Sequence, residues 1–250
     1  QAKAALCFEQ CIQTRIKTKE YIQIAGDYTD FGNYYLKNEQ AYGKAEQCYY
    51  RTIEYAQKLS NAEFLCRAYI NLSELEFRRA HQGDFTRLKQ YYSMALGAYG
   101  ITDTIFCETP SLSVLSKITN IELLLVMLNN KTEWLLNMYR NDGKKETLDA
   151  CLRSAMVMDS AITMARRQQI GEQSKLYWRN STRSFFVNAV EACYLANNNS
   201  LAFYFMEKSR AVLLNDKINE LNAAIHLPET ETAKEQGFIS RIVACKQRLN

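Results

Sequence analysis

Apolar residues in this chain recur at spacings of three and four, the period of an α-helix, and no run alternates apolar with polar residues as a strand would. One motif returns five times: a small or apolar residue, a large apolar residue four positions later, and a small residue three positions after that. It reads Ala4-Phe8-Cys11, Ala45-Tyr49-Thr52, Leu88-Tyr92-Ala95, Leu148-Leu152-Ala155 and Ala202-Met206-Ser209. These offsets place all three side chains on one helix face. The recurrence predicts helical hairpins that each bury a face against the next one.

Stop signals divide this pattern into elements. Gly83-Asp84, Asn141-Asp142-Gly143 and the Asn197–Asn199 run are typical of turns, and Pro110 and Pro228 interrupt helices. Asp84 and Ser111 can each cap the helix that follows. The predicted helices cover residues 2–17, 19–38, 41–59, 61–82, 84–98, 112–141, 144–169, 172–197, 200–222 and 229–249.

The organisation that follows from these elements has four parts. Residues 1–100 form repeats, 101–110 a loop, 111–226 longer hairpins, and 227–250 a connector helix toward a further domain. That last helix is amphipathic, with Ile239, Ile242, Val243 and Leu249 on one side. Because residues 2–17 match only the second helix of a hairpin, the first repeat is incomplete and the chain reads as an excised segment.

Composition agrees with an all-α chain. The 250 residues are 47% hydrophobic, and they include only 2 Pro and 9 Gly. No apolar run of about 18 residues occurs, so no membrane span is expected. The net charge of +4 comes from interspersed charges, and Arg78-Arg79 and Arg166-Arg167 are the only arginine pairs. Such pairs are typical of solvated helix faces, so no nucleic-acid partner is expected.

The eight cysteines include no C-x-x-C pair, and most occupy apolar positions of helices. Unpaired, scattered cysteines indicate a reducing compartment, and we expect a cytoplasmic location. Cys7 and Cys11 share a helix face, but the chain has only two histidines and no second cysteine pair, so neither zinc nor another metal is expected. No cofactor motif occurs.

The hairpins resemble tetratricopeptide repeats. Tyr28, Phe31, Gly32 and Tyr35 match the first helix of that repeat, and Tyr42, Ala45, Tyr49 and Thr52 match the second. Matches continue at Tyr69, Leu72, Ser73, Leu88, Tyr92 and Ala95, at Leu135, Leu136, Tyr139, Leu148, Leu152 and Ala155, and at Phe186, Ala189, Val190, Cys193, Ala202, Met206 and Ser209. The resemblance implies an α-solenoid of stacked hairpins. Successive motifs lie 41, 43, 60 and 54 residues apart, longer than the nominal period of about 34, so the later hairpins are elongated.

A second resemblance covers residues 130–250. Ala202-Phe203, Glu207, Ser209-Arg210-Ala211 and Leu213-Leu214 are similar to a segment of bacterial CHAT proteins, in which such repeats precede a caspase-like cysteine peptidase domain. The Leu227-Pro228-Glu229 break and the charged helix after it resemble the connector of that family. The resemblance implies a catalytic His and Cys downstream of this chain and a peptidase domain in cis.

No catalytic residues are predicted within the chain itself. His81 precedes a turn and His226 precedes a proline, where neither is presented beside a nucleophile. No phosphate loop, HExxH or GxSxG pattern occurs. We therefore expect no enzymatic activity from this segment.

Partner binding is expected on the concave face of the first helices. In such repeats the positions one, five and eight after the first-helix aromatic point into the groove, a rule that selects Thr29, Asn33 and Leu36, then Ile70, Glu74 and Phe77, and later Val187. Lys37 stands beside the first set, and Asn33 with Lys37 suits a peptide backbone or a carboxylate. The predicted binding residues are Asn33, Lys37, Glu74, Phe77, Glu133, Asn137, Arg140, Glu191 and Tyr194. Simple solvation or helix–helix hydrogen bonding is an equal alternative for each one.

Three functions remain open at this point. The first is a regulatory arm that binds a protein or peptide and controls an adjacent CHAT peptidase. The second is a free-standing adaptor. It would be favoured if the reading frame ended without a strand-rich segment that carries a His and a Cys. The third is a nucleic-acid-binding repeat, against which the nearly balanced charge argues.

Overall fold

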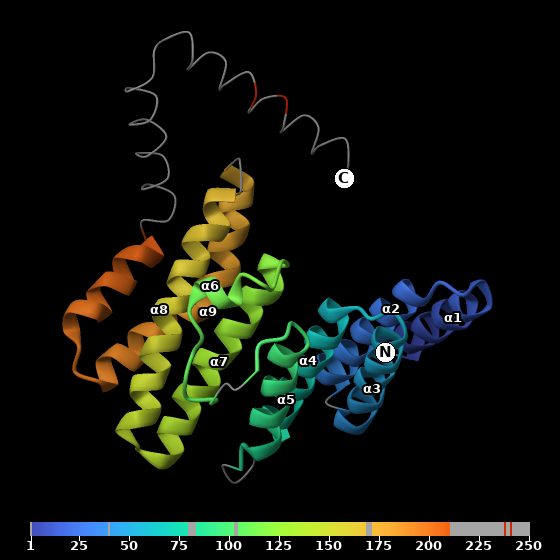
Figure 1. Ribbon diagram of the computed structural model, residues 1–250, viewed down its shortest axis with the longest axis horizontal. Helices are drawn as coiled ribbons and strands as arrows, with labels where there is room; N and C mark the ends of the chain where they lie inside the picture. Colours follow the sequence, from blue (N-terminus) through green and yellow to red (C-terminus); the bar gives the residue numbers. More distant parts are fainter. Residues whose placement is uncertain are drawn as a thin grey trace. The chain divides into compact units, whose positions relative to one another are not determined.

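The computed structural model describes residues 2–39, 41–79, 84–102, 105–168 and 172–210, together with Phe238 and Arg241. Every regular element in these residues is helical, and they contain no strand, so the all-α prediction is confirmed (Figure 1). Gly83, His81, His226, residues 211–222 of the ninth predicted helix and most of the 227–250 connector lie outside the described residues. None of the described helices combines the length and the hydropathy that crossing a membrane requires.

The chain divides into two compact units. The first consists of Gln1–Asn130 and Arg140–Gly143, and the second of Lys131–Tyr139 and Lys144–Asn250. The predicted boundaries at 100, 110 and 226 were drawn from turn signals, and they stay a prediction.

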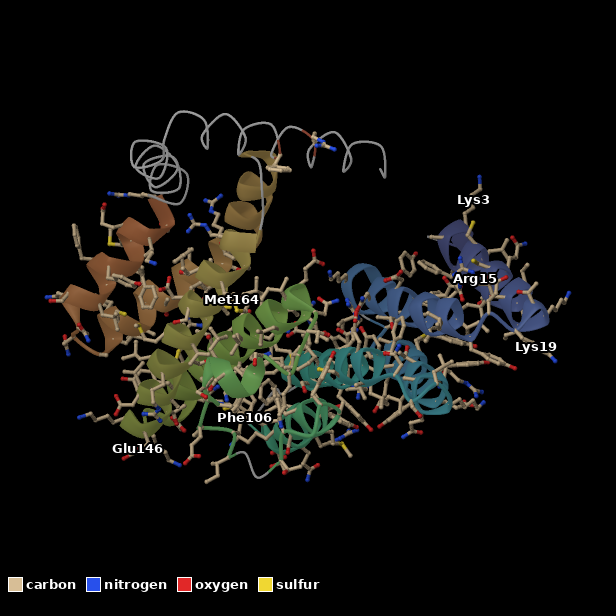
Figure 2. The ribbon with its side chains drawn as sticks, turned by 45° about the horizontal axis from the view of Figure 1, so that its top comes forward. Lys3, Arg15, Lys19, Phe106, Glu146 and Met164 are labelled. Atoms are coloured by element: carbon tan, nitrogen blue, oxygen red, sulfur yellow. The ribbon has the colours of Figure 1, made fainter. Side chains whose placement is uncertain are left out.

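In the first unit, consecutive helices pack as hairpins. The helices are α1 (Ala2–Thr18), α2 (Tyr21–Tyr34), α3 (Tyr42–Lys58), α4 (Ala62–Arg79) and α5 (Thr86–Gly97), with a π-helical turn at Tyr35–Glu39 after α2. The most extensive contacts join α2 to α3 and α4 to α5, while α3 also packs on α4 and α1 on α2. Arg15 of α1, labelled in Figure 2, forms an ion pair with Asp27 of α2.

The recurring motif supplies the contact surface inside these hairpins. Ala45, Tyr49 and Thr52 of α3 are fully buried, and the ring of Tyr49 lies against Gly32 of α2. A Cβ atom added at Gly32 would lie 2.5 Å from a ring carbon of Tyr49, which is closer than real Cβ contacts occur. Glycine at this position therefore sets how near α2 and α3 approach each other.

The second hairpin uses the same arrangement. Leu88, Tyr92 and Ala95 of α5 are buried, and the Ser73 hydroxyl of α4 donates to the Leu88 carbonyl at 3.3 Å. Phe106, labelled in Figure 2, meets the ring of Tyr92 edge to face with centroids 5.4 Å apart.

The predicted single helix 112–141 is wrong, because the structure has two helices in its place. A short α6 (Leu112–Leu115) is separated from α7 (Ile121–Asp142) by residues 116–120. Asn120 explains the break: its side-chain oxygen accepts the Leu123 amide at 3.0 Å, as an N-cap residue does, and its amide donates to Glu63 of α4 at 2.8 Å. Ile118 is buried and anchors the break.

The second unit holds part of α7, α8 (Lys145–Gln168), α9 (Glu172–Leu195) and a helix over residues 199–210. Trp134 and Phe185 are fully buried in this unit. The Thr132 hydroxyl of α7 donates to Ser154 of α8 at 3.2 Å, and Phe185 of α9 meets Phe205 edge to face at 6.0 Å between centroids. These contacts join the four helices in pairs.

Burial of the motif changes along the chain. Its copies in α3 and α5 are buried, whereas the large residues Phe8 of the first copy and Leu152 of the copy in α8 are partly exposed, and Met206 of the last copy is 38% exposed.

Candidate functional site

The nine predicted binding residues are all at least partly exposed in the structure. The rule that selected them is wrong at three further positions, since Thr29, Leu36 and Ile70 are buried. Thr29 shares a hydrogen bond of 3.3 Å with Thr52 of α3 and donates to the Ala25 carbonyl, so it serves helix packing. Because these side chains are buried among the helices of the first unit, they are not available to line an open groove.

Asn33 and Lys37 lie at the end of α2 and in the π-helical turn that follows it. The Tyr49 hydroxyl donates to the Asn33 side-chain oxygen at 3.0 Å, which orients that amide. Lys37 is exposed and forms no ion pair with any described residue. A π-helical turn widens the helix locally and is frequent at functional sites.

Glu74 and Phe77 of α4 make contacts within the first unit. Glu74 accepts from Arg78, one turn further along, at 2.7 Å. The Phe77 ring stacks on Phe85 with centroids 6.5 Å apart. Both side chains therefore have partners within the chain. This agrees with the alternative that they serve helix packing and not partner binding.

The arginine pair Arg78-Arg79 is also engaged with carboxylates. Arg79 contacts Glu46 of α3 at 2.9 Å and Glu76 at 3.1 Å, and Arg87 of α5 reaches the same two carboxylates. Two guanidinium groups and two carboxylates balance in charge across three helices, so this surface is not a basic patch of the kind that binds phosphates.

Glu133, Asn137 and Arg140 of α7 follow one helix face. The Asn137 amide donates to the Glu133 carbonyl at 2.9 Å, which turns it back onto its own helix, while Arg140 is exposed. Glu133 and Asn137 belong to the second unit and Arg140 to the first.

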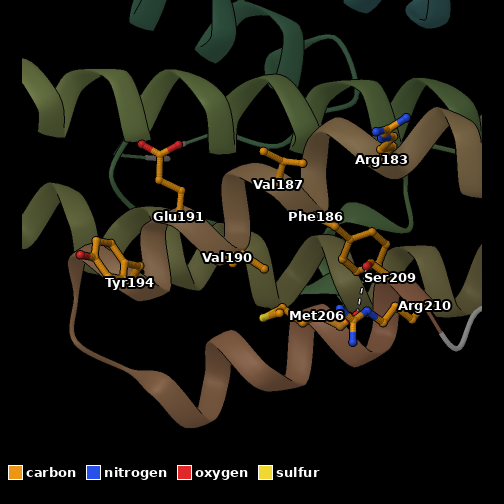
Figure 3. A pocket seen from close by; sticks show the side chains of 9 residues that line it. All are labelled: Arg183, Phe186, Val187, Val190, Glu191, Tyr194, Met206, Ser209 and Arg210. Atoms are coloured by element: carbon orange, nitrogen blue, oxygen red, sulfur yellow. Dashed lines mark hydrogen bonds between the residues drawn. The ribbon is translucent and has the colours of Figure 1, made fainter.

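Glu191 and Tyr194 are brought into a groove. It lies in the second unit between α9 and helix 199–210, has a volume of about 840 Å³, and is drawn in Figure 3. Its lining residues are Arg183, Phe186, Val187, Val190, Glu191, Tyr194, Met206, Ser209 and Arg210. The volume falls in the range of sites that hold a ligand or several side chains.

The local fold that builds this groove is set by the turn before helix 199–210. Asn197 has a positive φ of 54°, which asparagine tolerates, and the Asn198 side chain accepts the Leu201 amide at 3.0 Å as an N-cap. The predicted turn at Asn197–Asn199 is thus confirmed. It reverses the chain so that Met206, Ser209 and Arg210 face α9 (Figure 3).

Helix 199–210 is also tied to α8 from its other side. Asp159 of α8 is buried, accepts the Tyr204 hydroxyl at 2.7 Å and lies 3.5 Å from the Lys208 ammonium. The Lys208 ammonium stands over the Tyr204 ring, 5.3 Å from its centroid. A buried carboxylate with two partners fixes the orientation of this helix, and hence of the groove wall.

The groove has an apolar middle and charged ends. Phe186 is buried at its floor, whereas Val187 is 59% exposed on α9. In Figure 3, Arg183 and Arg210 lie at one end, and Glu191 and Tyr194 lie at the other. Arg210 also lies 3.7 Å from Glu207, an exposed pair that contributes little to stability. Such a surface suits an amphipathic chain segment whose charges are split between its two ends.

The cysteine next to the groove is not placed for chemistry. Cys193 of α9 is buried, and burial raises the pKa of its thiol to about 11, so the thiol stays protonated at neutral pH. Within the described residues, no three His, Cys, Asp or Glu side chains come close enough together to hold a metal ion. In α1, desolvation and the neighbouring Asp27 carboxylate likewise raise the pKa of the Cys11 thiol above its ordinary value.

Six of the groove residues were not predicted as a site: Arg183, Phe186, Val190, Met206, Ser209 and Arg210. Four of them, Phe186, Val190, Met206 and Ser209, match positions of the repeat motif that pack between helices. In the middle of a repeat array, the next hairpin covers such positions. The signal that could have marked them is their place in the last matched hairpin, where that cover is not supplied by any described helix.

Comparison with known proteins adds no identification. No protein-family model, curated protein or solved structure matches the chain.

Proposed function

We propose that this chain is a protein- or peptide-binding regulatory arm, built of tetratricopeptide-like repeats, that acts on an adjacent CHAT caspase-like peptidase. The observation that carries the binding part is the groove of about 840 Å³ between α9 and helix 199–210. The family assignment rests on the repeated motif, on the Gly32–Tyr49 contact between paired helices, and on the Ala202-to-Leu214 segment.

The chemistry of the groove selects its ligand class. Val187, Val190 and Met206 offer a strip of apolar surface, and an amphipathic helix buries such a strip with side chains three and four positions apart. Arg183 and Arg210 favour a carboxylate at one end of that ligand. The groove is therefore suited to a helical peptide with an apolar stripe and an acidic end.

Coupling to a peptidase would run through helix 199–210, since it forms one wall of the groove and leads toward the C-terminus. A ligand shifts a packing equilibrium only by binding one arrangement more tightly than the other. A peptide that grips both walls of the groove meets this requirement, because its affinity depends on how helix 199–210 sits against α9.

The test is a selection of helical peptides from a display library against the full chain, followed by fluorescence anisotropy on the selected peptides. We expect an apolar stripe with an acidic end in the selected sequences. We also expect Val187→Asp to weaken their binding at least about tenfold, since it places a carboxylate on the apolar strip. Val126→Asp is the matched control, because Val126 is a similarly exposed valine on α7 outside the groove lining. Equal binding by both variants would contradict the proposal.

The peptidase part has its own test in a parent protein that continues past Asn250. There, a selected peptide is expected to change peptidase activity, and deletion of residues 229–250 is expected to abolish that change. If the partner-dependent activity is the same after the deletion, the coupling through these residues is wrong.

A further inference from the structure

Exposed apolar side chains gather on α9 and helix 199–210, beside the groove that these two helices form. Val187 and Tyr194 of α9 are 59% and 74% exposed, and Phe203 and Met206 of helix 199–210 are 64% and 38% exposed. Phe203 lies three positions before Met206, which lines the groove, so both side chains belong to one face of that helix. Several large apolar side chains this exposed on two neighbouring helices mark a surface that a partner covers.

The charges around this surface are arranged so that the surface complements itself. Arg183 and Arg210 lie at one end of the groove, and Glu191 lies toward the other end (Figure 3). A two-fold axis across the middle of the groove turns a second copy end for end, so that the basic end of each copy faces the acidic end of the other. A surface with this property suits a symmetric dimer.

We propose that a second copy of this chain docks in the groove, through a two-fold interface in which helix 199–210 of each copy lies in the groove of the other. This inference goes beyond the proposed function, since it assigns the groove a partner that the chain itself supplies. The two partners exclude each other, because a helical peptide and helix 199–210 of a second copy need the same apolar strip.

Helix 199–210 has the surface that such docking requires. It presents Phe203, Met206 and Arg210 along one face, at spacings of three and four. This face carries the apolar stripe and the charged end that an amphipathic helix brings to a groove. Because helix 199–210 is also one wall of its own groove, the two-fold axis places its two copies side by side, with α9 on the outer side of each. Both grooves are then filled by one and the same contact.

Charge selects the direction in which the two copies of helix 199–210 run. In the antiparallel arrangement, Arg210 of each copy approaches Glu191 of the other, since these residues lie at opposite ends of the groove. In the parallel arrangement, Arg210 of one copy would approach Arg183 and Arg210 of the other, and like charges disfavour that contact. Within its own copy Arg210 lies 3.7 Å from Glu207, and such an exposed pair offers little resistance to a new partner.

The first measurement is sedimentation equilibrium of the full 250-residue chain at concentrations up to about 0.1 mM. We expect a mass that rises with concentration toward twice the 28.9 kDa of one chain. Phe203→Asp is expected to weaken the dimer at least about tenfold, because it places a carboxylate in the apolar interface. Val126→Asp, at an exposed valine of α7 outside the groove lining, is the control and is expected to leave the dimer unchanged.

An exchange of charges tests the pairing itself. Arg210→Glu and Glu191→Arg each bring like charges together at both contacts of a homodimer, so each variant alone is expected to dimerise at least about tenfold more weakly. An equal mixture of the two variants is expected to recover the dimer, because opposite charges meet again at both contacts of the mixed pair. Circular dichroism verifies that each variant alone is folded. Arg51→Glu, which reverses an arginine with a similar exposed glutamate pair outside the groove, is expected to leave the dimer unchanged.

A chain that stays monomeric over this range overturns the proposal. So do oligomers larger than a dimer, a dimer that Phe203→Asp leaves intact, and a mixture of the two charge variants that stays monomeric. The two proposals fail separately: selected peptides that bind a monomeric chain contradict only this inference, and a dimer of this kind that no selected peptide dissociates contradicts only the proposed function.

Discussion

Gly32 shows how one residue decides the spacing of a helix pair. It lies on α2 where the buried ring of Tyr49 presses against the backbone, and the Tyr49 hydroxyl then reaches Asn33 one position later. The small residue, the ring and the hydrogen bond act together: the ring fills the space that the missing side chain leaves, and its polar end still finds a partner.

Replacement of Gly32 tests this contact. We expect Gly32→Ala to lower the free energy of unfolding by about 1–3 kcal/mol, because the new methyl group overlaps the Tyr49 ring. The measurement is urea unfolding followed by circular dichroism. Gly43→Ala, in α3, is the matched control: no atom lies within 4 Å of its added Cβ, so it is expected to be neutral or to stabilise by up to ~1 kcal/mol. Equal effects of the two substitutions would refute the packing role of Gly32.

At the scale of elements, asparagine N-caps determine where several helices begin. Asn61, Asn120 and Asn198 each accept a backbone amide three residues later, at 3.1, 3.0 and 3.0 Å. The cap satisfies an amide that has no partner inside its own helix. This explains why α7 begins at Ile121 although the apolar pattern runs back to Leu112.

Helix 199–210 is held on α8 by Asp159, and this attachment can be measured. Asp159→Ala and Tyr204→Phe should each lower the free energy of unfolding. The double variant should lower it by about 0.5–3 kcal/mol less than the sum of the two single effects, because both substitutions remove the same hydrogen bond. The measurement is a double-mutant cycle in urea. Ser160→Ala combined with Tyr204→Phe is the control pair, since Ser160 is exposed and its hydroxyl donates to the Met156 carbonyl of its own helix; that pair is expected to be additive. Additivity in the Asp159 cycle would show that the attachment is not formed in solution.

At the scale of the whole molecule, buried thiols link stability to alkaline pH. Burial raises the pKa of Cys48 and Cys193 to about 11 and that of Cys66 to about 12, from an ordinary value of 9.0. Below pH 9 both the folded and the unfolded chain keep these protons. Above it the unfolded chain loses them first, so the unfolded state is favoured increasingly as the pH rises.

We therefore expect the free energy of unfolding to fall between about pH 9 and pH 12 and to be insensitive to these thiols below pH 9. The measurement is urea unfolding at several pH values in the presence of a reductant. Cys66→Ala is expected to make this decline less steep, whereas Cys7→Ala, which removes an exposed thiol, leaves the slope unchanged. A slope that Cys66→Ala does not alter would contradict the burial of Cys66 in solution.

Much of the element pattern is local and could be predicted from the chain alone. The helical period, the turn before α5, where the Asp84 carboxylate accepts the Thr86 amide at 2.9 Å while Phe85 occupies the N-cap position, and the turn at Asn197–Asn199 depend on residues within a few positions of one another. The same is true of the motif that places Ala45, Tyr49 and Thr52 on one face of α3. Local geometry is sufficient there because helix period and capping involve near neighbours in sequence.

The sequence by itself determined that the chain is helical, where most helices turn, and which face of each carries the apolar motif. Only the tertiary structure decided which of those faces stay open. Thr29 and Ile70 follow the same spacing as Asn33 and Glu74 and yet are buried, whereas Met206 follows the spacing of Tyr49 and yet is exposed. The physical reason is that a helix face is defined by its own residues, but its burial depends on whether another helix, distant in the sequence, packs against it.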